Sequence, residues 1–375
     1  MDVLFVTFSE RRSGYSRRIV TGRQGWLAGP GLLAAAAAVT AVSGAAAGAS
    51  RTGSTPVTRF LVHVATQSFG STRSEIVASD GRVIRVVARN DTAAISPNQR
   101  LIAWDGAGGI RVENVDGSRS RLLVKVRCAG KRKPGVTVDG CGGQFAWSSD
   151  SRHLLVQESN TGLAAVSVDS GAVRQVVAPA RHVTYTPVGW SARADALAFI
   201  LDDEGGANGV GCCAQALVLA RPSGGTRRTV YDAREPIHDR PAPAWSPNGR
   251  WIAFTTDGRD LRDPRLAIVE AATGKSRAVK GYAGYTAPPV WAPDSSRFAA
   301  GSYQGPIAVY SAAGAKLATL PATSAVPLFW TGGEIYFMSG AETTGRLLAI
   351  PAGGGAARTV FTLPAGQMLL SAEPL

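Results

Sequence analysis

The residues that could do chemistry lie in a few long segments that are rich in glycine, proline and charge. One segment holds a basic run between two cysteines, a second holds an acidic run beside two glycines, and a third holds a His-Asp pair. Long polar segments on a rigid scaffold are where binding residues usually lie. We therefore predict a binding rim built from Lys131, Arg132, Lys133, Asp202, Asp203, Glu204, His238 and Asp239.

Catalytic and metal chemistry have weaker support in the sequence. Asp257, Asp260 and Asp263 offer oxygen ligands, but the stretch lacks the final glutamate of a calcium loop and has Arg259 and Arg262 among the acids. No phosphate-binding glycine loop or Ser/His/Asp arrangement stands out. We therefore expect no catalytic residues, no metal site and no cofactor.

The four cysteines suit an oxidising compartment. Cys128 and Cys141 bracket a glycine-rich segment, and a disulfide between them would stabilise it by about 2–3 kcal/mol. Cys212 and Cys213 are adjacent, which leaves a vicinal bridge, two thiols or pairing with the first two cysteines open. Zinc is the weaker alternative, because the chain has no Cys-x-x-Cys motif.

The N-terminal residues have the three parts of an export signal. Five arginines precede an uncharged, alanine-rich stretch that ends in the small residues Ala47-Gly48-Ala49. The uncharged stretch is also long enough to be a retained anchor, and the arginines would then keep the N-terminus cytoplasmic. Both alternatives place the folded body outside the cytoplasm. We expect residues 1–49 to be a signal peptide or a signal-anchor helix, and residues 50–58 to be a linker.

The formal net charge of +13 permits an anionic partner such as nucleic acid, anionic lipid or an acidic cell-wall polymer. However, no basic stripe interleaved with aromatic residues is present, so we expect no specific nucleic-acid binding. The excess arginines are interpreted mainly as solvated surface residues. Any membrane contact is expected only through residues 26–49, if they stay attached.

A phrase that recurs six times determines the expected fold. A residue that is usually Trp is followed by Ser, Ala or Thr, in several copies by Pro and by Asn or Asp, in some by glycine, and then by a short apolar run. We call this segment the phrase. The copies begin at Ala94, Ala146, Gly189, Ala244, Val290 and Phe329. Repeats of about 40–55 residues made of short strands and tight turns are typical of a β-propeller.

Seven further strand-turn-strand units, many with Asp-Gly or Thr-Gly turns, alternate with the phrases. Only six phrases accompany the seven units, so one blade lacks its inner pair of strands. We expect that pair from the two ends, because residues 60–64 and 367–371 both have the pattern of a strand. We predict an all-β, seven-bladed propeller over residues 59–375, with four antiparallel strands per blade and a C-terminal strand that closes the ring. Six blades is the alternative. The phrase tryptophans Trp147, Trp190, Trp245 and Trp291 are expected to pack between blades.

The segment Ala244-Trp245-Ser246-Pro247-Asn248-Gly249-Arg250-Trp251-Ile252-Ala253-Phe254 resembles the repeat of TolB-like β-propellers. The resemblance covers about residues 59–373 and implies an extracytoplasmic propeller that serves as a platform for protein partners. TolB itself has an α/β domain before its propeller, whereas only a signal and a linker are expected here. The resemblance is therefore to the family and not to TolB proper.

These observations favour an exported, non-enzymatic propeller that binds a protein or a cell-envelope component through its rim. Periplasmic, secreted and outward-facing anchored forms all fit the sequence. The alternative is an extracytoplasmic hydrolase or lyase with a site in the central funnel. A sensor whose retained N-terminal helix reports ligand binding is a third option.

Overall fold

The structure is a computed structural model that describes most of the chain after residue 57. The described residues are 58–66, 71–89, 93–106, 108–125, 145–158, 162–178, 180, 183–203, 214–233, 243–256, 265–280, 289–302, 305–322, 324–339 and 345–375. The chain divides into two compact units, Met1–Thr52 and Gly53–Leu375, and every described residue belongs to the second. The predicted signal or anchor helix lies outside the described residues. The described ranges contain strands but no helix, and hence no apolar helix of membrane-spanning length.

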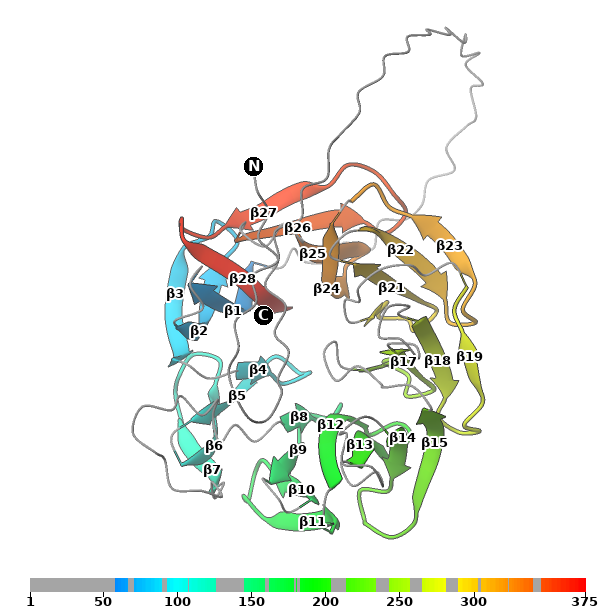
Figure 1. Cartoon of the computed structure of the whole chain (residues 1–375). Coiled ribbons are helices and arrows are strands. Elements are labelled where there is room, and N and C mark those ends of the chain that lie inside the picture. The colour runs from blue at the N-terminus through cyan, green and yellow to red at the C-terminus, as the bar shows by residue number, and fades with distance from the viewer. Residues whose placement is uncertain are drawn as a thin grey trace, which may run out of the picture. The chain divides into compact units, whose positions relative to one another are not determined.

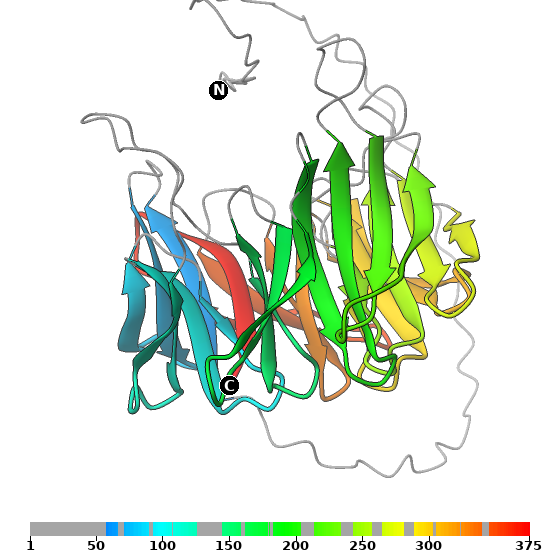
Figure 2. The ribbon, with the colours of Figure 1, turned by 90° about the horizontal axis from the view of Figure 1, so that it is seen from below.

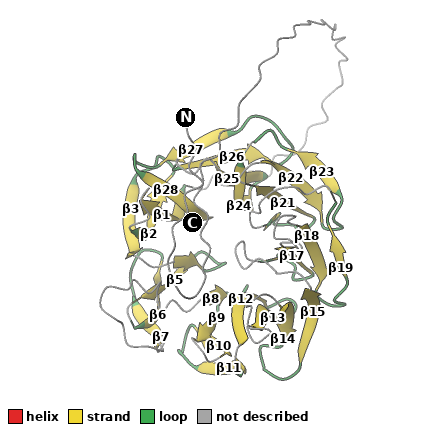
Figure 3. Cartoon of the chain, in the orientation of Figure 1, coloured by secondary structure: helices red, strands yellow, loops and turns green. Residues whose placement is uncertain are grey.

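The second unit is a ring of four-stranded antiparallel sheets, which we number as blades 1 to 7 (Figures 1 and 3). From the centre outward, blade 1 contains β28 (Gln367–Pro374), β1 (Arg59–Thr66), β2 (Thr72–Ala78) and β3 (Val83–Arg89). Blade 2 contains β4 (Ala93–Ile95), β5 (Leu101–Gly106), β6 (Gly109–Asn114) and β7 (Arg121–Lys125). Blade 3 contains β8 (Phe145–Trp147), β9 (His153–Glu158), β10 (Gly162–Ser167) and β11 (Val173–Val177).

The remaining four blades repeat this order. Blade 4 contains β12 (Val183–Ser191), β13 (Ala196–Asp203), β14 (Ala214–Ala220) and β15 (Arg227–Ala233). Blade 5 contains β16 (Ala244–Trp245), β17 (Trp251–Thr256), β18 (Arg265–Glu270) and β19 (Ser276–Ala278). Blade 6 contains β20 (Val290–Trp291), β21 (Arg297–Ser302), β22 (Gly305–Ser311) and β23 (Lys316–Thr319). Blade 7 contains β24 (Ala325–Thr331), β25 (Glu334–Ser339), β26 (Arg346–Pro351) and β27 (Arg358–Thr362), and the pair Ser302↔Ala325 links it to blade 6.

The core consists of seven separate hydrophobic clusters, one at each interface between neighbouring blades. Side chains alternate between the two faces of a strand. In β17, Trp251 and Ala253 therefore pack toward blade 6, whereas Ile252 and Phe254 pack toward blade 4. Each blade consequently needs a partner on both of its faces.

The two ends of the described chain meet in blade 1 and close the ring. β28 pairs antiparallel with β1 from Phe60↔Pro374 to Thr66↔Gln367, and Leu375 N donates to Arg59 O at 2.9 Å. On the face of blade 1 that packs against blade 7, the fully buried ring of Phe60 contacts three aromatic rings, namely Phe329, Tyr336 and Phe361. The predicted seven blades and terminal closure are confirmed, and the six-bladed alternative is wrong.

A carboxyl group adds a contact to this closure near the centre of the ring. Glu373 on β28 accepts a hydrogen bond at 2.8 Å from the backbone N–H of Ile95, on the inner strand of blade 2. Burial raises the pKa of Glu373 to about 7, and the Ile95 N–H opposes that shift. The C-terminal strand therefore contacts both blade 1 and blade 2.

We predict that Glu373 makes the stability of the ring depend on pH. Its pKa is higher in the folded chain than in the unfolded chain, so its contribution is fully present below about pH 4.5 and is lost as pH rises through about 7. The unfolding free energy of Glu373→Gln relative to wild type should rise across this window by about 3 kcal/mol. Denaturant unfolding at several pH values measures the difference. His63, whose pKa is lowered by burial, titrates in both chains and cancels in the comparison. A difference that does not change with pH would contradict the prediction.

Candidate functional site

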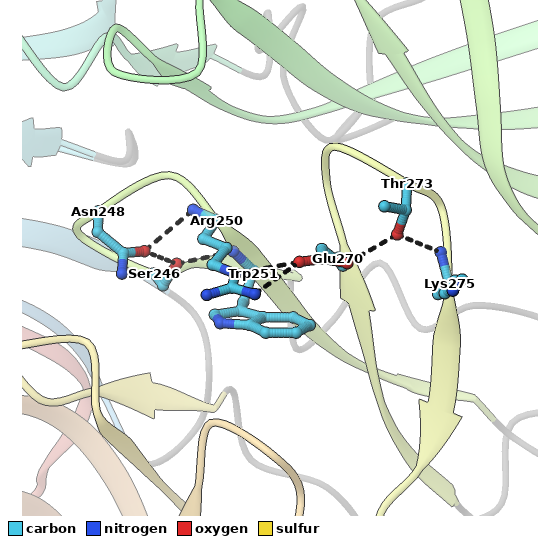
Figure 4. Close-up of polar contacts among 7 residues, drawn as sticks. All are labelled: Ser246, Asn248, Arg250, Trp251, Glu270, Thr273 and Lys275. Atoms are coloured by element: carbon cyan, nitrogen blue, oxygen red, sulfur yellow. Dashed lines mark hydrogen bonds and ion pairs between the residues drawn. The ribbon is translucent and has the colours of Figure 1, made fainter.

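The turns that follow the inner strands share one hydrogen-bond network, shown for blade 5 in Figure 4. Ser246 Oγ donates to Asn248 Oδ1 at 2.8 Å and accepts from Trp251 N at 2.9 Å, while Asn248 Oδ1 also accepts from Arg250 N at 3.0 Å. The same bonds recur around Ser96 in blade 2 and Ser148 in blade 3. The side chains of the phrase therefore satisfy the backbone of a tight turn, as expected from its composition. We call the side of the ring that carries these turns the turn face.

The phrases also bond to one another across blade interfaces. The backbone N–H of Asn98 donates to Ser151 Oγ of the next blade at 3.0 Å, and Asn248 N donates to Ser295 Oγ at 3.0 Å. Of the four phrase tryptophans expected between blades, Trp147, Trp190 and Trp291 are buried, while Trp245 is partly buried against the same kind of cluster. The indole N–H groups of Trp147 and Trp291 donate to backbone carbonyls of the preceding blade at 3.2 and 3.0 Å.

A second set of interblade contacts, farther from the centre, uses arginines that sequence reasoning assigned to the solvated surface. In five consecutive blades, a guanidinium on the outermost strand donates to a backbone carbonyl in the outer turn of the next blade. The pairs are Arg85–Val115, Arg121–Val168, Arg174–Pro222, Arg228–Ala271 and Arg277–Ala313. We call these five the outer-strand arginines. A carbonyl partner is neutral, so such a bond leaves the positive charge uncompensated. Arg85 is the exception among the five, because it also pairs with Glu113 at 2.5 Å.

The sequence has five long segments, at residues 127–142, 202–215, 232–241, 257–264 and 281–287. All five continue from strands that end on the opposite side of the ring, which we call the insertion face (Figure 2). β7, β13, β15, β17 and β19 end there, in blades 2, 4 and 5. Asp202 and Asp203 are the last residues of β13, although their side chains are not described. Lys131, Arg132, Lys133, Glu204, His238 and Asp239, together with Cys128, Cys141, Cys212 and Cys213, lie outside the described residues.

On the turn face, blade 4 departs from the common turn. Its phrase reads Ser191-Ala192-Arg193-Ala194, without the Asn or Asp that the phrases of blades 2, 3, 5 and 6 carry. The strand pairing therefore continues to Ser191↔Ala196, and the left-handed residue is Asp195, with φ of 45°. In blades 2, 3, 5 and 6, the left-handed residue comes four places after the Trp position, whereas Asp195 comes five places after Trp190. Those four residues are Gln99, Ser151, Gly249 and Ser295. Arg193 thus occupies the place that a turn-capping amide or carboxylate holds in those blades.

A cavity of about 470 Å³ lies beside this altered turn, between blades 4 and 5. We call it the blade 4–5 cavity. Its apolar wall consists mainly of small residues, which leave the space open, and includes Ala196, Leu219, Ala220 and Ala271. Gly249 lies in the wall with φ of 71°, and a Cβ at this position would point at Ser191 Oγ.

Four arginines line the blade 4–5 cavity, and they differ in how they are held. Arg228 is an outer-strand arginine that donates to Ala272 O at 2.8 Å as well as to Ala271 O. Arg250 pairs with Glu270 at 3.0 Å and lies over the Trp251 ring (Figure 4). The remaining two, Arg193 and Arg221, are exposed and make no ion pair or hydrogen bond through their side chains with any described residue.

Glu270 is already engaged by its own blade. Thr273 Oγ1 donates to Glu270 Oε2 at 2.8 Å, and this bond, followed by the bond from Arg250, lowers the pKa of the carboxyl group. The carboxylate thus stays charged and neutralises Arg250. Among the described residues, no group of three or more His, Cys, Asp or Glu side chains comes together as a metal-ligand set.

No family model matches the chain, and no curated protein does. Solved structures with a similar fold include TolB from Acinetobacter baumannii, with 13% identity over 68% of this chain and 62% of that chain and a TM-score of 0.46. The match therefore spans less than two thirds of that protein's own length. A putative TolB from Agrobacterium tumefaciens shares 11% identity over 85% of this chain and 99% of that chain, with a TM-score of 0.45.

An oligogalacturonate lyase in complex with manganese is similar as well. It shares 12% identity over 72% of this chain and 80% of that chain, with a TM-score of 0.50. Similarity at this level of identity supports the β-propeller fold alone. It does not distinguish a binding protein from an enzyme.

We predict that Gly249→Ala destabilises the chain more than Gly224→Ala. Both glycines have positive φ, which costs a substituted alanine about 1 kcal/mol. At Gly249 the new Cβ would clash with Ser191 Oγ, which also accepts a hydrogen bond from Ala194 N, and would lie 3.2 Å from Ala194 N itself. At Gly224 nothing lies within 4 Å of the new Cβ. The added clash should bring the loss at Gly249 to about 3 kcal/mol. Denaturant unfolding of the two variants measures both losses, and equal losses would argue against the tight contact between blades 4 and 5.

Proposed function

We propose that this protein is an exported, non-enzymatic propeller whose insertion face binds a protein or a cell-envelope component. The observation that carries this proposal is topological: the five long segments continue from strand ends on one face of a ring that is closed by its own chain ends. A rigid ring with variable segments on one face is a common arrangement for binding. The arginine-rich, then uncharged N-terminal sequence supports export.

Charge is unevenly distributed among these segments. Residues 126–144, which follow blade 2, carry Arg127, Lys131, Arg132 and Lys133 against a single acid, Asp139. Residues 202–213, which are the end of β13 and the segment up to β14, carry three acids and no base. A partner that matches both signs would be selected by electrostatic complementarity, which favours specificity and the association rate more than raw affinity.

We predict that the basic segment is needed for binding. The full chain, carrying an affinity tag, is used to capture partners from envelope fractions. It is compared with a chain in which residues 127–142 are replaced by a short turn and with Lys131→Ala/Arg132→Ala/Lys133→Ala. The component enriched by wild type should be lost with both variants, and wild-type capture should weaken as salt is raised.

Arg100→Gln/Arg119→Gln provides the matched control, because it removes positive charge from the turn face and should retain the partner. Thermal unfolding of each chain shows whether the ring is intact. If the trimmed, folded chain captures the partner as well as wild type does, residues 127–142 are not the binding surface.

A further inference from the structure

The blade 4–5 cavity carries more positive than negative charge. Arg193, Arg221, Arg228 and Arg250 line it, and Asp195 is the acid in the wall. Arg250 is neutralised by Glu270 beside it, but Arg228 is bonded to neutral carbonyls and keeps its charge. With Asp195 counted against one arginine, positive charge remains at the mouth of the cavity, where an anion would be attracted.

Two of these arginines have no structural task in the described part of the chain. The side chains of Arg193 and Arg221 make no ion pair or hydrogen bond there, whereas Arg228 holds two blades together. Arg193 also stands where the phrases of blades 2, 3, 5 and 6 have a turn-capping Asn or Asp. Those residues are Asn98, Asp150, Asn248 and Asp294. The blade 7 phrase also lacks this residue, but there Gly332 and Gly333 form the turn, whereas blade 4 has a charged side chain at the position. A repeat that gives up a local stabilising residue often does so at a functional site.

The shape and chemistry of the cavity suit an organic ligand with an anionic end. Its volume of about 470 Å³ lies within the range of small-molecule sites, and its wall combines apolar residues such as Leu219 with a few charged groups. Guanidinium groups bind planar or tetrahedral oxyanions through paired hydrogen bonds.

We propose that the blade 4–5 cavity binds a ligand through an oxyanion, a phosphate or carboxylate group held by the guanidinium groups of Arg193 and Arg221. The cavity opens on the turn face, opposite the insertion face, so this proposal is independent of the proposed function. Arg228 provides the fixed positive background, and the alanines leave room for the rest of the ligand.

The test is a calorimetric titration of the purified full chain at low ionic strength with two probes, pyrophosphate and citrate. At least one probe should bind with a stoichiometry of one, and Arg193→Gln/Arg221→Gln should weaken its binding at least tenfold without changing thermal unfolding. Tighter binding of pyrophosphate assigns the site to phosphorylated ligands, and tighter binding of citrate assigns it to carboxylated ligands. Either result supports the proposal.

The matched control is again Arg100→Gln/Arg119→Gln. These two exposed arginines lie in turns of blade 2 on the same face, so the control removes the same charge without touching the cavity. Its affinity should stay within about twofold of wild type. The proposal is overturned if neither probe binds, if the Arg193/Arg221 variant binds like wild type, or if the control loses as much affinity as that variant does.

Discussion

Each blade carries two apolar faces, and only a closed ring gives both of them a partner. The seven clusters at the seven interfaces show this directly, since residues that are adjacent in one strand belong to different clusters. An open array would leave the aromatic surface around Phe60 exposed on one terminal blade and a matching surface exposed on the other. The pairing of β28 with β1 prevents this, because the last strand of the chain completes the first blade.

Polar contacts reinforce the interfaces at two distances from the centre. Near the inner strands, serine hydroxyls and indole N–H groups bond to the neighbouring phrase. At the outer strands, the five outer-strand arginines bond to backbone carbonyls of the next blade. These carbonyl partners are neutral, and only Arg85 also pairs with a described carboxylate, that of Glu113, so the contacts stabilise the ring and leave most of these positive charges uncompensated. Arg228 is one of these arginines, and its uncompensated charge lies beside the proposed oxyanion site between blades 4 and 5.

The architecture could be predicted from the sequence, because alternating apolar residues and turn residues act locally and repeat seven times. The phrase around Trp245 identifies its strand and turn, and the apolar stretch at Met368–Leu370 identifies the closing strand. The outer-strand arginines could not be assigned, since a backbone carbonyl partner has no sequence signature. The blade 4–5 cavity was missed because it joins turns that are distant in sequence, although the unusual Ala192-Arg193 in the blade 4 phrase was a usable signal. The predicted rim residues belong to segments outside the described residues, so their grouping stays a prediction.

The central claim is that the C-terminal strand completes blade 1 and thereby locks the ring. The most direct measurement is the thermal unfolding of a chain that ends at Gly366, alone and with a synthetic peptide of residues 367–375 added in excess. The truncated chain should unfold at a lower temperature and with lower cooperativity, and the peptide should bind and restore the transition in a concentration-dependent way. A truncated chain that unfolds like the full-length protein, or one that the peptide does not stabilise, would contradict the claim.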